Sequence, residues 1–352
     1  MPRARLPILA AALLALAPPR ATVGQAAPVR LVPAVGIGCA LCGGPEEFGV
    51  ITALAFGDDR LLVADRDEPH IRVFDLEGRL LTVVAPDGDG PGELRMPMGV
   101  ASDRTGMNAV DMRQSRVVHL APDGSDAGTV RLPSFPLAVA YRPGGGRPFV
   151  ALANFQDMTA SVAALGSDGE WSTILERVDA VPLGSQGGAP MVFSLARAPE
   201  GGFAIGVGVE RYLLLYFTAD GTPAATVQRD VERLPKSAAE IESERAAAAR
   251  FQGRVGGSPE AGASLREVDP LRRHFSIDAL RFDGAGRLWV RTDRGRGEQT
   301  VFDLFGPDRA YLGEVRIPAR VRAFTLGNGL LAGAVLDEYD VGTVRVWRVE
   351  DR

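Results

Sequence analysis

The sequence predicts an all-β protein, a six-bladed β-propeller with one helical insertion between blades 4 and 5. A unit that closes with a glycine recurs about every 46 residues: Gly78 and Gly124 are 46 positions apart, and Gly169 follows 45 positions later. The apolar runs within each unit are short, rich in β-branched and aromatic residues, and bounded by Gly, Asp or Pro, which is typical of strands. Setting aside an N-terminal segment of 26 residues and an insertion of 43 leaves 283 residues, enough for roughly six units.

Each repeat is expected to form one four-stranded blade. The first repeat has apolar runs at 51–56, 60–65 and 71–76, and the second has the same pattern at 98–103, 107–111 and 117–121. Radial packing of such sheets leaves few exposed strand edges, which is the propeller solution to the problem of unpaired strands. The predicted blades lie near residues 48–84, 94–131, 136–175, 190–227, 275–316 and 321–350.

The sixth repeat shows only three clear strands, the last of them at 343–349. A further apolar run, at 29–35, stands at the other end of the predicted propeller domain, which covers residues 27–352. We therefore expect a strand around residues 30–35 to supply the missing outer strand and to close the ring by pairing the two ends of the chain.

The insertion, residues 228–270, is the one long segment without a strand pattern. Ser237 and Glu240 have the spacing of a capping box, and the run 238–251 is rich in Ala, Glu and Arg before Gly253, so a helix of about 14 residues is predicted. As a connection between blades, the insertion should emerge on the face that also carries the loops between second and third strands. It either covers the channel mouth on that face or is a surface addition without a role.

The N-terminus has the pattern of a secretory signal peptide. Arg3 and Arg5 precede an apolar stretch at 6–17 and a small-residue region at 21–26, so we expect residues 1–26 to be removed. The apolar stretch is too short to span a bilayer comfortably, and none later approaches the roughly 20 residues required. These features predict a periplasmic or secreted monomer with no membrane span.

The two cysteines, Cys39 and Cys42, form one CxxC motif. Gly43 stands where covalent haem attachment requires His, and the Gly-rich setting differs from the strand-to-helix context of a thioredoxin-like site. Zinc would need further ligands, and none lies nearby in the sequence. A local disulfide between Cys39 and Cys42 is the prediction for an exported protein.

Two repeats resemble the NHL-repeat type of six-bladed propeller. The resemblance rests on Leu62-Val63-Ala64-Asp65 followed by His70-Ile71-Arg72-Val73-Phe74-Asp75, and on the stretch 88–101. The opening stretch Gly44-Pro45-Glu46-Glu47-Phe48-Gly49 is also similar to that of a group of uncharacterised secreted bacterial propellers. These resemblances imply the fold, whereas propellers of this kind host binding, lyase and lactonase functions alike.

Polar residues at the ends of the second strands are candidates for a binding face, because loops on a rigid scaffold often carry binding residues. Two interpretations compete with binding: a turn-capping role for the Asp and Asn side chains, and a ring of oxygen ligands for a cation in the channel. Basic residues that follow the insertion would supply cationic contacts to an anionic group. The predicted ligand-binding residues are Asp65, Arg66, Asp111, Arg113, Asn154, Arg273, His274, Asp293 and Asp337.

The net charge and the composition of the inner strands exclude some classes of function. A net charge of −5 argues against a nucleic-acid partner. The inner strands are mostly apolar or small, so we predict no catalytic residue, metal or cofactor. The expected function is an exported, non-enzymatic scaffold that binds a peptide, glycan or partner protein on its loop face. The alternative is a metal-assisted propeller lactonase or lyase.

Overall fold

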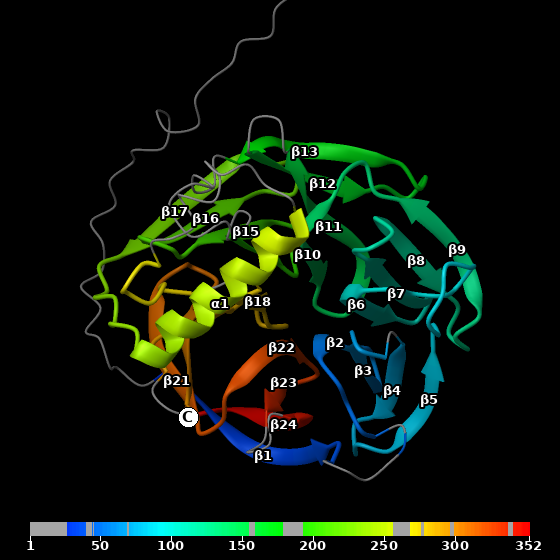
Figure 1. Ribbon diagram of the computed structural model, residues 1–352, viewed down its shortest axis with the longest axis horizontal. Helices are drawn as coiled ribbons and strands as arrows, with labels where there is room; N and C mark the ends of the chain where they lie inside the picture. The colour runs from blue at the N-terminus through cyan, green and yellow to red at the C-terminus, as the bar shows by residue number, and fades with distance from the viewer. Residues whose placement is uncertain are drawn as a thin grey trace, which may run out of the picture.

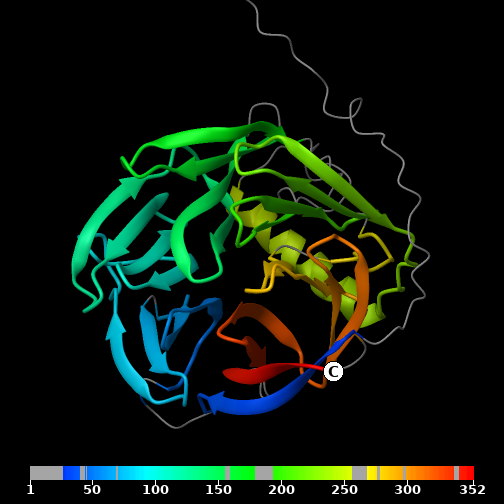
Figure 2. The same ribbon diagram turned by 180° about the vertical axis from the view of Figure 1, so that it is seen from behind.

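The computed structural model describes residues 27–39, 44, 46–68, 70–154, 159–178, 193–255, 268–275, 278–295, 299–336 and 341–352. These residues form six four-stranded antiparallel sheets arranged around a central axis (Figures 1 and 2). The all-β six-bladed propeller is therefore confirmed, with one helix inserted between blades 4 and 5.

Within each blade the strands run in sequence order from the axis outward, except in the last blade. Blades 1 to 3 consist of β2 (Ile51–Phe56), β3 (Arg60–Asp65), β4 (Ile71–Asp75) and β5 (Leu80–Val84); β6 (Pro97–Asp103), β7 (Gly106–Asp111), β8 (Arg116–Leu120) and β9 (Asp126–Arg131); β10 (Pro136–Arg142), β11 (Gly145–Asn154), β12 (Thr159–Leu165) and β13 (Trp171–Val178). Blades 4 to 6 consist of β14 (Phe193–Arg197), β15 (Phe203–Val207), β16 (Tyr212–Phe217) and β17 (Pro223–Arg229); β18 (Leu280–Phe282), β19 (Leu288–Thr292), β20 (Thr300–Phe305) and β21 (Tyr311–Ile317); β22 (Val321–Gly327), β23 (Leu330–Leu336), β24 (Gly342–Asp351) and β1 (Val29–Ile37).

The predicted ring closure is confirmed in blade 6. The N-terminal strand β1 pairs antiparallel with β24, from Val29 opposite Asp351 to Ile37 opposite Val344, with a bulge between Pro33 and Val35. The ends of β1 are anchored by Val29 and Ile37, which are 1% and 4% exposed. The outer strand of the last blade thus comes from the other end of the chain.

The sheets bury both of their faces, which explains the continuous apolar runs in the sequence. In β3, the four residues 61–64 are all buried although neighbouring side chains point to opposite faces of a strand. Among the described residues, the buried apolar side chains form six clusters, one between each pair of adjacent blades. The outer strands, by contrast, alternate between exposed and less exposed residues, as β9 does.

The recurring glycines, each preceded by an acidic residue, lie in the hairpin turns between third and fourth strands. Gly78, Gly124, Gly169 and Gly221 all have φ between 84° and 89°, a conformation that glycine adopts without strain. The period that predicted the fold is therefore the period of this turn.

Helix α1 (Ala238–Val255) begins where the capping box predicts. The Ser237 Oγ accepts a hydrogen bond from the Glu240 N–H at 3.2 Å, and the Glu240 carboxylate accepts one from the Ser237 N–H at 2.8 Å. The helix continues through Gly253 to Val255, four residues beyond the predicted end. One glycine costs a helix only about 1 kcal/mol, which is not enough to end it.

Candidate functional site

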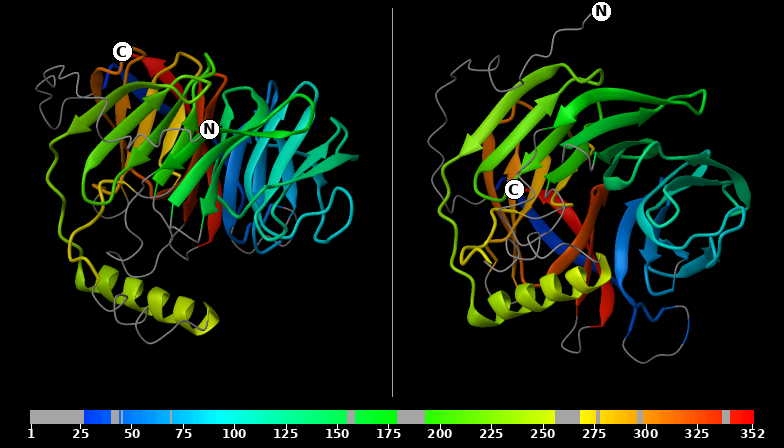
Figure 3. Two further views of the ribbon diagram at one scale, coloured as in Figure 1. Left: turned by 90° about the horizontal axis from the view of Figure 1, so that it is seen from above. Right: turned by 45° about the horizontal axis from the view of Figure 1, so that its top comes forward.

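The loop face carries the connections between blades and the loops between second and third strands, and α1 lies across part of it. Figure 3 shows the helix standing off this face, and Figure 1 shows it crossing from the rim toward the axis. The opposite face carries the hairpins that join first to second and third to fourth strands; we call it the hairpin face. The predicted ligand-binding residues were assigned to the loop face.

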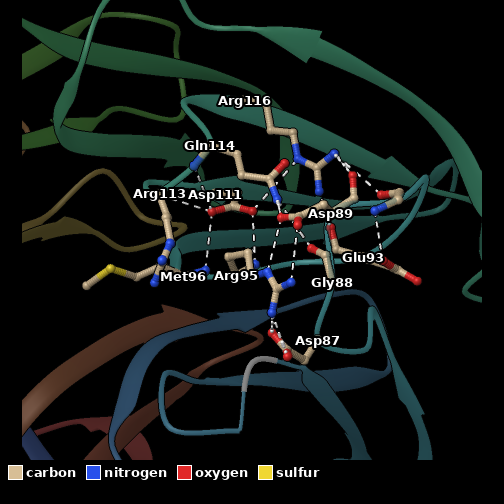
Figure 4. Close-up of polar contacts among 11 residues, drawn as sticks. Asp87, Gly88, Asp89, Glu93, Arg95, Met96, Asp111, Arg113, Gln114 and Arg116 are labelled. Carbon is tan, nitrogen blue, oxygen red and sulfur yellow. Dashed lines mark hydrogen bonds and ion pairs between the residues drawn. The ribbon is translucent and has the colours of Figure 1, made fainter.

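Asp65 and Asp111 are fully buried and act as caps for the backbone. The Asp65 carboxylate accepts hydrogen bonds from the N–H groups of Gly49 and Asp67, at 2.7 and 3.0 Å. The Asp111 carboxylate accepts four, from the N–H groups of residues 95, 96, 113 and 114, at 3.0 to 3.3 Å (Figure 4). Neither carboxylate is accessible to a ligand, so both fill the turn-capping role that competed with binding.

Each of these caps is paired with a buried arginine from the third strand. The guanidinium of Arg72 lies 3.3 Å from the Asp65 carboxylate, and that of Arg116 lies 3.8 Å from Asp111. Arg72 also donates to the carbonyl of Glu47 at 3.1 Å, and Arg116 to that of Glu93 at 2.6 Å. The Asp and Arg together hold the incoming connection between blades against the loop face.

The connections themselves repeat as well. Phe48 and Leu94 are 46 positions apart, and each is buried directly after the glutamate whose carbonyl the arginine binds. In the second connection, Arg95 forms ion pairs with Asp87 at 2.8 Å and with Asp89 at 3.1 Å (Figure 4). Arg95 thus bridges two carboxylates of the loop at 87–95, which makes this loop a structural element of blade 2.

The remaining predicted residues do not converge on one place. Arg66 is exposed and pairs with Asp67 on blade 1, and Arg113 is exposed on blade 2. Asn154 is exposed on blade 3, where it lines an open groove of about 580 Å³ together with Trp171. Asp337 and Cys42 lie outside the described residues, so the position of Asp337 and the Cys39–Cys42 disulfide stay predictions.

Helix α1 is tied to the propeller by ion pairs at its N-terminal half. Arg272 contacts the Glu240 carboxylate at 2.9 Å and donates to the carbonyl of Gly295 at 2.7 Å. The ammonium of Lys236, the only lysine of the chain, lies 2.7 Å from the Glu244 carboxylate. Burial would raise the pKa of Glu240, but hydrogen bonds from Arg272 and Ser237 lower it to about 2. The Glu240 carboxylate is therefore ionised at neutral pH and forms an ion pair with Arg272.

The connecting segments beneath α1 pair with each other. Pro235 and Leu271 form an antiparallel bridge, and hydrogen bonds of 2.7 to 2.8 Å flank it. The second of these segments continues directly into Arg273 and His274, for which the sequence predicts cationic contacts to a ligand.

His274 does not belong to such a surface. Its side chain is buried, and its ring packs edge-on against Tyr212 at 5.8 Å between centroids. Burial is the main cause that lowers the pKa of His274, and Arg233 and Arg294 add to it. The ring is therefore neutral near pH 7 and part of the interior, which corrects the prediction of a cationic ligand contact at this residue.

Asp293 differs from the equivalent residues of blades 1 and 2. It follows the second strand of blade 5, yet its carboxylate has no hydrogen-bond or ion-pair partner among the described residues, and it is only partly buried. Its backbone N–H donates to the carbonyl of His274 at 2.9 Å. The insertion replaces the short connection that the aspartate caps in blades 1 and 2, and no described backbone N–H of it donates to this carboxylate.

The surroundings of Asp293 are unusual for a surface carboxylate. Burial raises the pKa of Asp293, whereas the positive charges of Arg291, Arg273 and Arg272 act in the opposite direction. Glu244 of α1 also raises it, which places the helix within electrostatic reach of this group. A partly buried carboxylate with a shifted pKa beside a half-buried Arg273 is typical of a functional site.

A second charged cluster, between blades 4 and 5, is structural. The buried Asp303 accepts hydrogen bonds from Arg229 at 2.6 Å, Arg294 at 2.5 Å and the hydroxyl of Tyr311 at 3.2 Å. The guanidinium of Arg229 also stacks 3.6 Å above the ring of Tyr311. Sequence reasoning missed this cluster because its members lie on three strands and one loop of two blades.

Neither a metal cluster nor a membrane span is found in the part of the chain that the structure describes. No group of three or more His, Cys, Asp or Glu side chains is arranged there to hold a metal ion. No helix among the described residues is long and apolar enough to cross a membrane.

Comparisons with known proteins support the fold. No family model matches the sequence, and no curated protein does either. A Bacteroides fragilis protein proposed to be exported has a TM-score of 0.56 at 11% identity, with 94% of this chain and 98% of that one covered. A Bacteroides vulgatus member of the DUF4221 family has a TM-score of 0.54 at 13% identity, covering 92% and 99%. A gluconolactonase from Xanthomonas campestris has a TM-score of 0.52 at 13% identity, covering 94% and 99%. At such identities these likenesses establish the six-bladed propeller alone.

Proposed function

We propose that this protein is an exported, non-enzymatic propeller of the NHL-repeat type that binds a peptide, glycan or partner protein on its loop face, beneath α1. The observation that carries the proposal is the carboxylate of Asp293, which has no partner among the described residues and lies within electrostatic range of Arg273. The aspartates at the same repeat position in blades 1 and 2 cap backbone N–H groups, whereas Asp293 of blade 5, which follows the insertion, caps none among the described residues.

The two groups have the chemistry of a polar ligand site. A carboxylate can accept hydrogen bonds from hydroxyl, amide or cationic groups of a ligand, and a guanidinium can donate to its oxygens. The ion pair between Arg272 and Glu240 anchors α1 on the loop face. The helix can therefore exclude water from a bound ligand and strengthen the ligand's hydrogen bonds to Asp293 and Arg273. Export follows from the predicted signal peptide at 1–26, and proteins of similar fold include one proposed to be exported.

The metal-assisted lactonase or lyase is the competing function. Families of that kind place oxygen ligands on inner strands facing the axis, whereas the described residues that line the axial cavity include three arginines, Arg142, Arg197 and Arg281. Positive side chains disfavour a divalent cation there. Metal analysis of the purified protein tests this: we expect less than stoichiometric divalent metal, and one tightly held ion per chain would support the enzyme instead.

Replacement of residues 236–268 by a short Gly/Ser linker tests the binding proposal. The ring should remain folded, because α1 contributes no strand to any blade. Probed on a glycan array and a displayed peptide library, the parent should retain specific ligands that the linker variant retains at least tenfold more weakly.

Point variants separate the helix from the site below it. Asp293→Asn and Arg273→Gln should lose the same ligands as the linker variant, whereas Glu77→Gln, on an exposed hairpin of the opposite face, should bind like the parent. Ligands bound equally well by all of these variants would refute the site beneath α1.

A further inference from the structure

A second site lies at the other end of the channel, on the hairpin face. The inner strands end there, and their last residues together with the hairpin at 143–145 enclose a cavity of about 60 Å³. Its polar lining is cationic: Arg142, Arg197 and Arg281 contribute guanidinium groups, and no described lining residue carries a carboxylate.

Arg197 is held in place but is not neutralised. Its guanidinium lies 3.9 Å above the ring of Phe149, and its Nη1 donates to the carbonyl of Arg147 at 2.6 Å. No further hydrogen bond from this guanidinium occurs among the described residues, and its buried Nε has no partner. The stacking and the single hydrogen bond thus fix the plane of a group whose remaining donors are unused.

Arg142 places a second positive charge at the same mouth. Its side chain is exposed and forms no ion pair among the described residues. Burial and the charge of Arg142 together lower the pKa of Arg197 to about 10, so the two guanidinium groups repel each other while both remain charged at neutral pH. Asp103, on the neighbouring hairpin, does not line the cavity, and its Oδ1 accepts hydrogen bonds from the N–H and hydroxyl of Thr105 at 2.7 and 2.5 Å.

Arg281, the third arginine of the cavity, is ion-paired. Its guanidinium lies 2.6 Å from the carboxylate of Asp278 and donates to the carbonyl of Leu280 at 2.8 Å. Its charge is largely balanced, so the excess positive charge of the cavity comes from Arg142 and Arg197.

We propose that this cavity binds the oxyanion group of a small molecule, phosphate or carboxylate, between Arg142 and Arg197. Planar guanidinium groups bind both oxyanions through paired, charge-assisted hydrogen bonds, and two of them converge here without a carboxylate of the protein to occupy them. The small volume admits one such group and excludes a macromolecule. This site is independent of the loop-face site beneath α1, from which it is separated by the length of the channel.

Calorimetric titration with inorganic phosphate and with succinate, in a buffer of low ionic strength without either ion, tests the proposal. One ion should bind per chain, and the tighter of the two identifies the natural oxyanion. Arg142→Gln and Arg197→Gln should each weaken binding at least about tenfold, equivalent to about 1.4 kcal/mol. Arg345→Gln, an exposed arginine of β24 away from the channel, should bind like the parent.

Thermal melting provides a second readout that does not need a tight ligand. Without added anion, Arg142→Gln should melt no lower than the parent, because the substitution removes a repulsion and no ion pair. With added anion the parent should gain stability and the variant should gain less. Absence of binding by either ion, equal binding by the channel variants, or a lower melting temperature of unliganded Arg142→Gln would overturn the proposal.

Discussion

Deletion of residues 27–36 is expected to lower the melting temperature by about 10 °C or more relative to a chain that begins at residue 27. The deletion removes most of β1, exposes the hydrogen-bonding edge of β24, and eliminates the buried side chain of Val29. Burial of one such aliphatic side chain contributes about 1.5–3 kcal/mol, and the unpaired edge adds to the loss. Thermal unfolding followed by circular dichroism measures the change.

A matched control separates ring closure from the charges of β1. Arg30→Gln removes the exposed ion pair with Glu350, which lies at 2.7 Å, and such surface pairs contribute about 0–1 kcal/mol. This variant should melt within a few degrees of the parent. If the deletion behaved like Arg30→Gln, β1 would not be what closes the ring.

The ring and its closure could be predicted because they depend on local and periodic features. The turn between third and fourth strands requires a residue that tolerates positive φ, so a glycine recurs there, as at Gly78 and Gly124. Both faces of each sheet are buried, so the strands appear as continuous apolar runs. Because the last repeat has only three strands, the apolar run at 29–35 could be predicted to form its outer strand, β1.

The binding site could be predicted less well because equivalent positions have different surroundings. Asp111 ends a second strand and Asp293 directly follows one, yet the first accepts hydrogen bonds from four N–H groups and the second has no partner among the described residues. The difference is created by the preceding connection, a short repeated turn in one case and a 43-residue insertion in the other. The paired arginines at the hairpin face, Arg142 and Arg197, come from strands of different blades and leave no motif in the sequence.

Asp111→Ala is expected to destabilise the protein by about 3–5 kcal/mol, because it leaves the buried charge of Arg116 unpaired and four backbone N–H groups without an acceptor. Asp111→Asn should lie between Ala and the parent, since one side-chain oxygen can still accept from several of those groups. Chemical denaturation of the three proteins measures the difference in unfolding free energy. Equal stability of Asp111→Ala and the parent would show that the cap is dispensable.

The same substitution at the equivalent position of blade 5 should behave in the opposite way. Asp293→Ala removes a carboxylate that caps nothing, so unfolding at neutral pH should not become easier. Burial raises the pKa of Asp293 in the folded protein, so the folded state holds this proton more tightly than the unfolded chain. The stabilisation from that protonation is complete below the unfolded pKa, about 3.9, and is lost as the pH rises through the higher folded value. Relative to Asp293→Asn, the parent should therefore lose stability over this interval. A parent that instead gained stability would mean that the Asp293 carboxylate is paired in the folded state, as Asp111 is, and not free to receive a ligand.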